Sequence, residues 1–182
     1  MYDRSFLEKA RGMSVEEKRE LARKIEDTAA YNEKTYGFCG QSTLAALQEH
    51  LQLENNEVFR ASTPLSGGIT ALGEVCGAVT GVLLVIGQLY GRDKFCPLEE
   101  VLKSRMSAQV RDYAAEYTDA FKKEFGSVRC RDVMKKVFGK SWNLRDPEEM
   151  KEFLRPEVHD DCGNIIARKA GRIAAELLLD LR

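Results

Sequence analysis

The stretch from Gly73 to Gly91 is the most apolar run of the chain, and it constrains the fold more than any other part. Gly73, Gly77 and Gly81 are four residues apart, so on a helix they lie on one face. A glycine inside a helix costs about 0.5–1 kcal/mol relative to alanine. Close packing of a second helix against this face would offset that cost. The spacing therefore predicts a buried central helix over about residues 74–91, with another helix pressed against its glycines.

Cys76 lies near the start of this predicted helix, directly before Gly77. The positive end of the helix dipole stabilises a thiolate and lowers the pKa of a cysteine there. Because Gly77 has no side chain, the thiol is predicted to be both activated and approachable.

Helical signals recur along the rest of the chain. Ser14 and Glu17 form a capping-box pattern, and Gly37 ends the helix that follows. No alternating strand pattern is present, so the sequence predicts an all-α, single-domain multi-helix bundle. Residues 1–35 are expected to form an N-terminal helical extension packed on the core of a domain over residues 36–182. Further helices are expected from Phe38, Pro97, Ser127, Asp146 and His159, with a glycine-rich loop over 64–68 and a break at Pro156.

Charge and hydropathy exclude several classes of function. The chain has 28 basic and 29 acidic residues, and this balance does not favour a nucleic-acid partner. The apolar run over 75–90 is shorter than the roughly 20 residues of a membrane span. The first residues lack the apolar region of a signal peptide. Five cysteines in a chain without an export signal indicate a reducing, cytoplasmic setting.

The cysteines share a position relative to the predicted helices. Four of them fall in or near a first helical turn, and Cys96 precedes the helix expected from Pro97; the four are Cys39, Cys76, Cys130 and Cys162. Helix starts from distant parts of the chain can point at one centre, which would favour a bound anion, a reactive thiolate or an iron–sulfur cluster. The alternative is that each cysteine only fills space in the core.

Several segments resemble the C_GCAxxG_C_C family of redox-active proteins. The match is centred on Cys76–Gly81, which fits the CGAxxG motif, and its flanks include Gly67–Ile69 and Leu89–Gly91. Similar segments surround the other three cysteines, at Cys39–Ser42, Phe125–Cys130 and Asp161–Cys162. The resemblance implies a small helical protein, typical of anaerobes, whose four cysteines act together. A similar module accompanies haem and an Fe–S centre in split-Soret cytochromes. Because this chain has no CxxCH motif, covalent haem is not expected.

The first functional hypothesis is therefore a metal or iron–sulfur site with Cys39, Cys76, Cys130 and Cys162 as ligands. Four thiolates suit iron–sulfur clusters and also zinc. His159 is a candidate substitute ligand or hydrogen-bond donor to a cluster sulfur, although a histidine before two aspartates is more often a solvated loop residue.

Two alternatives belong to other classes. A metal-free thiol–disulfide oxidoreductase would use Cys76 as nucleophile and Cys39, Cys130 or Cys162 as resolving cysteine, and it predicts two spatial pairs of thiols instead of one group of four. A structural or interaction protein would use the glycine face as a dimer interface. The expected partners are a redox protein or a small thiol or disulfide substrate, together with a second copy of the chain. Whether the protein is an enzyme stays open.

Overall fold

A computed structural model describes residues 5–92, 95, 97–103 and 105–181. Within these residues the chain is all-α, as predicted, and an isolated bridge between Val75 and Arg129 is the one non-helical pairing. The helices are α1 (Ser5–Arg11), α2 (Val15–Tyr36), α3 (Cys39–Leu51), α4 (Asn56–Ala61), η1 (Thr63–Leu65), α5 (Gly77–Tyr90), α6 (Leu98–Lys103), α7 (Arg105–Phe125), α8 (Cys130–Phe138), α9 (Pro147–Phe153), α10 (Pro156–Asp161), η2 (Cys162–Ala167) and α11 (Arg168–Leu178).

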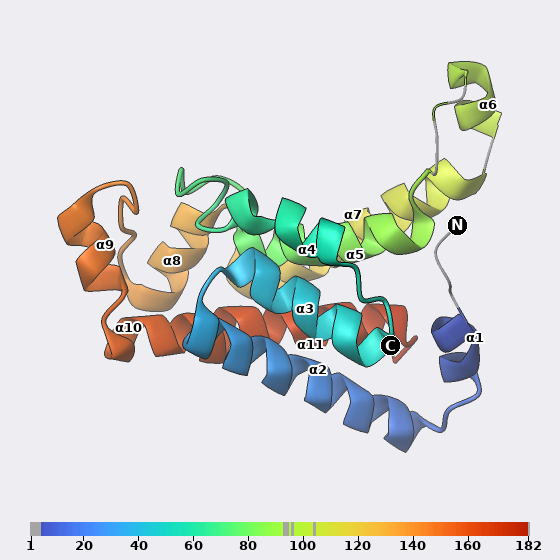
Figure 1. Ribbon diagram of the computed structural model, residues 1–182, viewed down its shortest axis with the longest axis horizontal. Coiled ribbons are helices and arrows are strands. Elements are labelled where there is room, and N and C mark those ends of the chain that lie inside the picture. Colours follow the sequence, from blue (N-terminus) through green and yellow to red (C-terminus); the bar gives the residue numbers. More distant parts are fainter. Residues whose placement is uncertain (1–4, 93–94, 96, 104, 182) are drawn as a thin grey trace.

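The apolar helix α5 lies at the centre of the bundle, between α3 and α7 (Figure 1). Its glycine face is covered by α3, as the four-residue spacing predicted. A Cβ built on Gly77 would overlap Cys39 Sγ, and one on Gly81 would overlap the carbonyl oxygen of Gly40 and Thr43 Oγ1. On the opposite side, Tyr117 and Phe121 of α7 are fully buried against the core.

Two details of the glycine prediction are wrong. Helix α5 starts at Gly77 and not near residue 74, so Gly73 lies in the preceding loop, where its φ of +73° is a left-handed conformation that glycine adopts readily. Because α3 already occupies the face with Gly77 and Gly81, that face is not available as a dimer interface.

Helices α2 and α3 are joined by a tight turn that brings their ends together. Helix α2 begins at the predicted capping box of Ser14 and Glu17 and ends at Gly37. Gly37 and Phe38 both have positive φ, and Ser42 Oγ donates to the Gly37 carbonyl at 2.7 Å. The last turn of α2 therefore lies beside the first turn of α3.

The C-terminal helix starts earlier than predicted. The break expected at Pro156 is present, since α9 ends at Phe153, but Pro156 also occupies the first turn of α10, where a missing N–H costs nothing. The backbone then stays helical from α10 through the π-helical segment η2 into α11. His159 consequently belongs to a helix and not to a solvated loop.

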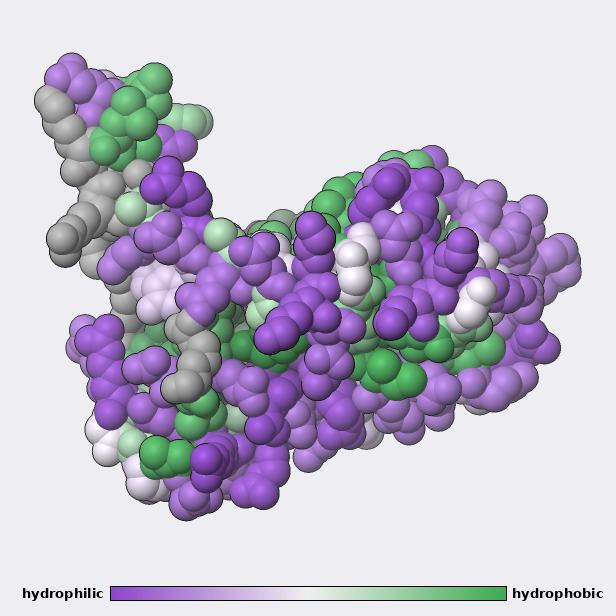
Figure 2. Space-filling view, turned by 180° about the vertical axis from the view of Figure 1, so that it is seen from behind, coloured by the Kyte–Doolittle hydropathy of each residue, from purple (hydrophilic) through white to green (hydrophobic). Residues whose placement is uncertain are grey.

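The predicted helix over 97–125 is described as α6 and α7, on either side of residue 104. Cys96, predicted to precede this helix, lies outside the described residues. The α6 arm projects from the bundle at the end away from α8, α9 and α10 (Figure 1). From behind, polar residues cover much of the surface, while apolar side chains are exposed on this arm, namely Leu98 and Leu102 (Figure 2). Within the described part of the chain, no helix has the length and apolarity to cross a membrane.

Candidate functional site

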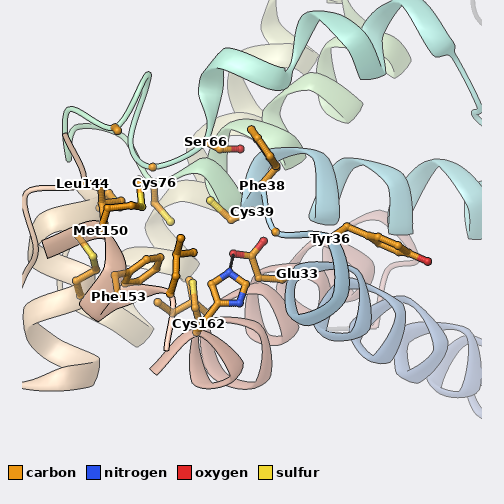
Figure 3. A pocket seen from close by; sticks show the side chains of 18 of the residues that line it. Glu33, Tyr36, Phe38, Cys39, Ser66, Cys76, Leu144, Met150, Phe153 and Cys162 are labelled. Atoms are coloured by element: carbon orange, nitrogen blue, oxygen red, sulfur yellow. Dashed lines mark ion pairs between the residues drawn. The ribbon is translucent and has the colours of Figure 1, made fainter. Parts of the chain in front are cut away.

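The four cysteines of the predicted site line one cavity of about 660 Å³. We call it the cysteine cavity. It lies where the starts of α3, α5 and α8 meet the junction of α10 and η2. Each of the four is a free thiol and is buried. Figure 3 shows Cys39, Cys76 and Cys162 directed toward this common space. The residues thus come from four separate segments of the chain, as one group instead of two distant pairs.

The contact between α3 and α5 places the first two cysteines. Cys39 is the first residue of α3, and Cys76 is the N-cap residue of α5. Because Gly77 lacks a side chain, the Cys39 thiol lies directly against the start of α5. The nearby backbone amides of Gly67 and Ala78 favour the thiolate of Cys39, and the amide of Ala78 also favours that of Cys76, so both oppose the rise in pKa that burial causes.

A short extended pairing places Cys76 beside Cys130. The amide of Cys76 donates to the Val128 carbonyl at 2.8 Å, and the amide of Arg131 donates to the Gly73 carbonyl at 3.1 Å. These bonds surround the isolated bridge between Val75 and Arg129. They join the start of α5 to the start of α8, two segments more than 50 positions apart in the sequence.

The glycine-rich loop before α5 covers this pairing. Gly68 has a φ of +71°, and a Cβ built on it would lie 2.6 Å from the Glu74 amide nitrogen and 2.7 Å from Cys130 Cβ. The backbone φ angle is positive at every residue of this loop from Gly67 through Ala71. Arg145 holds the outer part of the loop by donating to the Thr70 carbonyl at 3.0 Å. The loop therefore forms part of the wall over two of the thiols.

Cys162 does not occupy a helix N-terminus, and that prediction is wrong. It is the first residue of the π-helical segment η2, but the backbone is already helical from Pro156. Single π-helical turns inside α-helices are frequent at functional sites. Here the segment packs on α2: a Cβ on Gly163 would lie 2.8 Å from the Ala30 carbonyl oxygen. Close approach of the two backbones brings Cys162 to the end of α2.

The electrostatics of the cavity oppose ionisation of its thiols. Burial, more than any other cause, raises the pKa of all four cysteines, and the pKa of Cys130 rises to about 12. Each thiolate also repels others in the group; Cys162 feels the charges of Glu33 and of the other three cysteines. Helix-terminal amides oppose the rise at Cys76, and Arg131 opposes it at Cys130. The thiolates cannot all form together without a compensating positive charge.

The prediction that Cys76 is activated and approachable is therefore wrong. Its residue is 3% exposed, and burial outweighs the favourable amides of Ala78 and Val79. Gly77 makes room for the Cys39 thiol and not for an approaching substrate. A thiol–disulfide nucleophile needs an accessible thiolate with a lowered pKa, and Cys76 has neither property.

Two further polar groups lie in the cavity, and sequence reasoning missed the first of them. Glu33, from the last turn of α2, is 3% exposed. Its Oε1 lies 3.6 Å from Nε2 of His159, whose side chain is 14% exposed (Figure 3). Burial raises the pKa of Glu33 to about 7, while the nearby Ser42 and Cys162 side chains oppose the rise. Burial lowers the pKa of His159.

The rest of the cavity wall is mostly apolar. Phe153, Met150 and Leu144 close one side, and Figure 3 shows them opposite Glu33 and Phe38. Behind Phe153, the ring of Trp142 is buried and contacts the rings of Phe138 and Phe153. Apolar walls exclude water and strengthen every electrostatic interaction inside the site.

The thiols surround the cavity instead of converging on one point. Among the described residues, no three Cys, His, Asp or Glu side chains lie close enough together to hold a single metal ion. A mononuclear zinc site would require four sulfurs about 2.3 Å from one centre. The described residues do not form such a set.

The fold and the site define a class: an all-helical protein with four buried thiols around one cavity. The model of the family described as "Putative redox-active protein (C_GCAxxG_C_C)" matches residues 37–177 of this chain. This match covers most of the sequence and all four cysteines, so the chain belongs to the C_GCAxxG_C_C family, as its motifs indicated. No curated protein and no solved structure matches it. The predicted boundary between an N-terminal extension (residues 1–35) and the cysteine-containing domain stays a prediction. Glu33, which belongs to the extension, lines the cavity of that domain.

Proposed function

We propose that this redox-active protein holds an iron–sulfur cluster through Cys39, Cys76, Cys130 and Cys162. The observation that carries the proposal is that four segments, distant in sequence, each contribute one buried thiol to a single cavity. Core cysteines that only fill space have no reason to gather in this way. Four thiolates are the usual ligands of iron–sulfur clusters.

The donor set and the shape of the cavity fit this group. Thiolates select iron–sulfur clusters and zinc among the common metals. We favour a polynuclear cluster over a single ion because, among the described residues, no three such side chains lie close enough to hold one ion, while all four cysteines line the same cavity. A bound cationic centre also provides the positive charge that the four thiolates need, since coordinating thiols are deprotonated outright. When bound, the cluster supplies one-electron transfer.

The chain's own residues would tune such a centre. The nearby amides of Gly67, Ala78 and Val79 favour the thiolate forms of Cys39 and Cys76 and would be available to donate to their sulfurs. Hydrogen bonds to sulfur and exclusion of solvent are two of the main determinants of cluster potential. The apolar wall with Phe153 and Leu144 keeps water away from the thiols. These features support a redox centre that is protected from solvent and exchanges electrons with a partner protein.

The proposal extends to the setting of the protein. A cluster of this kind exchanges electrons with a redox partner protein, or indirectly with a small thiol or disulfide. It survives best in a reducing compartment such as the cytoplasm, and in anaerobes. A homodimer stays a prediction, and its interface would have to lie away from the covered face of α5.

The test is metal and sulfide analysis of protein purified under strict anaerobiosis, together with visible absorption before and after reduction with dithionite. We expect iron and acid-labile sulfide in stoichiometric amounts and visible absorption that bleaches on reduction. The fourfold serine variant of the site cysteines should lose all three signals. Cys96→Ser is the matched control, because it removes a thiol outside the proposed ligand set, and it should keep them.

Two other outcomes of the metal and sulfide measurement would indicate a different kind of site. Zinc without sulfide would indicate a structural or thiol-activating site held by the same cysteines. Wild-type protein without metal, in which Cys76 reacts rapidly with disulfides, would overturn the proposal in favour of the thiol–disulfide reading.

A further inference from the structure

Glu33 is the one carboxylate that reaches the cysteine cavity from among the described residues that line it. It belongs to the last turn of α2 and continues the buried stripe formed by Ala22, Ile25 and Ala29. A glutamate at such a position is rarely buried unless it is paired. Figure 3 shows its side chain on the same side of the cavity as Cys39 and Cys162.

The two oxygens of Glu33 have different surroundings. Oε1 lies 3.6 Å from His159 Nε2. Oε2 is buried and has no hydrogen-bond partner among the described residues. Leaving a buried carboxylate oxygen without a partner destabilises the folded protein, because the lost contacts with water are not replaced. An unsatisfied group of this kind in a folded protein calls for an explanation, and an absent ion is one of the usual ones.

The neighbouring cations of the protein are engaged with other carboxylates. Lys34, the next residue, lies 3.5 Å from Asp160 at the surface. Arg168 pairs with Asp27 and Arg172 with Glu26, both farther back along α2. In the described part of the chain, the ion pair of Glu33 is the one with His159. These cations therefore lie with other carboxylates, which leaves Oε2 open to a group bound in the cavity.

We propose that Glu33 supplies an oxygen donor to the metal centre that the four cysteines hold, through the free Oε2. This role rests on the proposed function. His159 would act as a positioning residue: it contacts the other oxygen and so fixes the carboxylate, as outer-shell partners of metal ligands commonly do. One metal position would then differ from the others, because it has a hard oxygen ligand beside soft sulfurs.

The test is X-ray absorption at the iron edge on the anaerobically purified protein, which reports the ligand atoms directly. Wild-type protein should show an oxygen or nitrogen ligand in addition to sulfur. Glu33→Ala and Glu33→Gln should lose this light-atom contribution while keeping most of the iron, since the four cysteines remain. His159→Phe should keep it. Asp160→Asn, which removes a carboxylate of α10 that pairs with Lys34 at the surface, is the matched control and should leave the spectrum unchanged.

Each other result overturns the role of Glu33. A wild-type cluster with sulfur ligands alone contradicts it while leaving the four-cysteine centre intact. A light-atom contribution that survives in both Glu33 variants but is lost in His159→Phe assigns the ligand to the histidine instead. Wild-type protein without metal removes the centre and the role together. Circular dichroism of each variant identifies any that fails to fold, and a wild-type spectrum with sulfur ligands alone overturns the role of Glu33 whichever variants fold.

Discussion

Gly77 lies directly against the Cys39 thiol, so closely that a Cβ at position 77 would overlap Cys39 Sγ. This contact joins the two properties of the central sequence motif. The glycine allows α3 and α5 to pack closely, and the same close packing sets the position of the first cysteine beside the second. The motif therefore has two roles: its glycine allows the two helices to pack closely, and this packing places Cys39 beside Cys76.

Gly77→Ala should disturb both the fold and the site. The added methyl group meets Cys39 Sγ and the Gly40 amide nitrogen, the latter at 3.1 Å. Overpacking of this kind typically costs about 1–3 kcal/mol. We expect a loss of that size in the free energy of unfolding, measured by urea denaturation, together with reduced metal content.

Gly87→Ala is the matched control for this change, because it lies in the same helix with nothing within 4 Å of the added Cβ. It should be neutral or stabilise the protein by about 0.5–1 kcal/mol, since alanine favours helix. Equal stability of the two variants would contradict the packing argument.

The burial of Glu33 predicts a dependence of stability on pH. Its pKa rises from 4.5 to about 7 in the folded state, so between these values the folded apoprotein binds the proton more tightly than the unfolded chain does. Stability from this group is complete below pH 4.5 and is lost as the pH rises through 7. Glu33→Gln removes the effect, so its advantage over wild-type apoprotein should grow between pH 5 and pH 8, by on the order of 2–3 kcal/mol.

The difference between the two proteins is the quantity to measure, by urea denaturation in the presence of chelator and reductant. His159, whose pKa is lowered by burial, acts in the opposite direction: its contribution rises with pH up to about its ordinary value of 6.5. Because His159 contacts Glu33, the two titrations are coupled, and the comparison isolates Glu33 only when it is repeated in a His159→Phe background. A difference that stays constant from pH 5 to pH 8 would argue against a buried, titrating carboxyl group.

The buried thiols should react slowly. In a Cys96→Ser background, we expect metal-free native protein at pH 8 to react with an aromatic disulfide reagent at least about tenfold more slowly than free cysteine, because the thiolate is both buried and disfavoured. Unfolded protein should react at all four remaining positions. Rapid modification of one thiol in the native protein, identified as Cys76 by mass spectrometry, would favour the thiol–disulfide reading.

Much of the fold could be predicted from local signals. The capping box of Ser14 and Glu17 involves neighbouring residues, and so does the stop at Gly37, so both are readable in the sequence. The glycines of α5 indicated a helix contact because their spacing is regular. Pro156 was ambiguous, since proline both ends one helix and favours the first turn of the next. Because of that ambiguity, His159 was expected in a loop and Cys162 at the start of a helix. Both lie inside the helical run that begins at Pro156.

The site depended on information that no short segment contains. The family motifs identified the four cysteines, but the pKa values of their thiols follow from burial, which only the assembled helices determine. In the sequence, Glu33 cannot be told apart from the exposed charged residues of the same helix. Its place on the stripe of Ala22, Ile25 and Ala29 was a usable signal, because a glutamate in a buried stripe needs a partner. The partner, His159, is over 120 positions away in the sequence.

The most direct measurement of the central claim is the iron and sulfide content of the four single serine variants, Cys39→Ser, Cys76→Ser, Cys130→Ser and Cys162→Ser, each purified anaerobically beside the wild type and Cys96→Ser. If the four thiols hold one centre, each of the four variants should lose or alter the cluster, while wild type and Cys96→Ser contain equal amounts of it. A full and spectroscopically unchanged cluster in any of the four variants, or no metal in the wild type, would contradict the account.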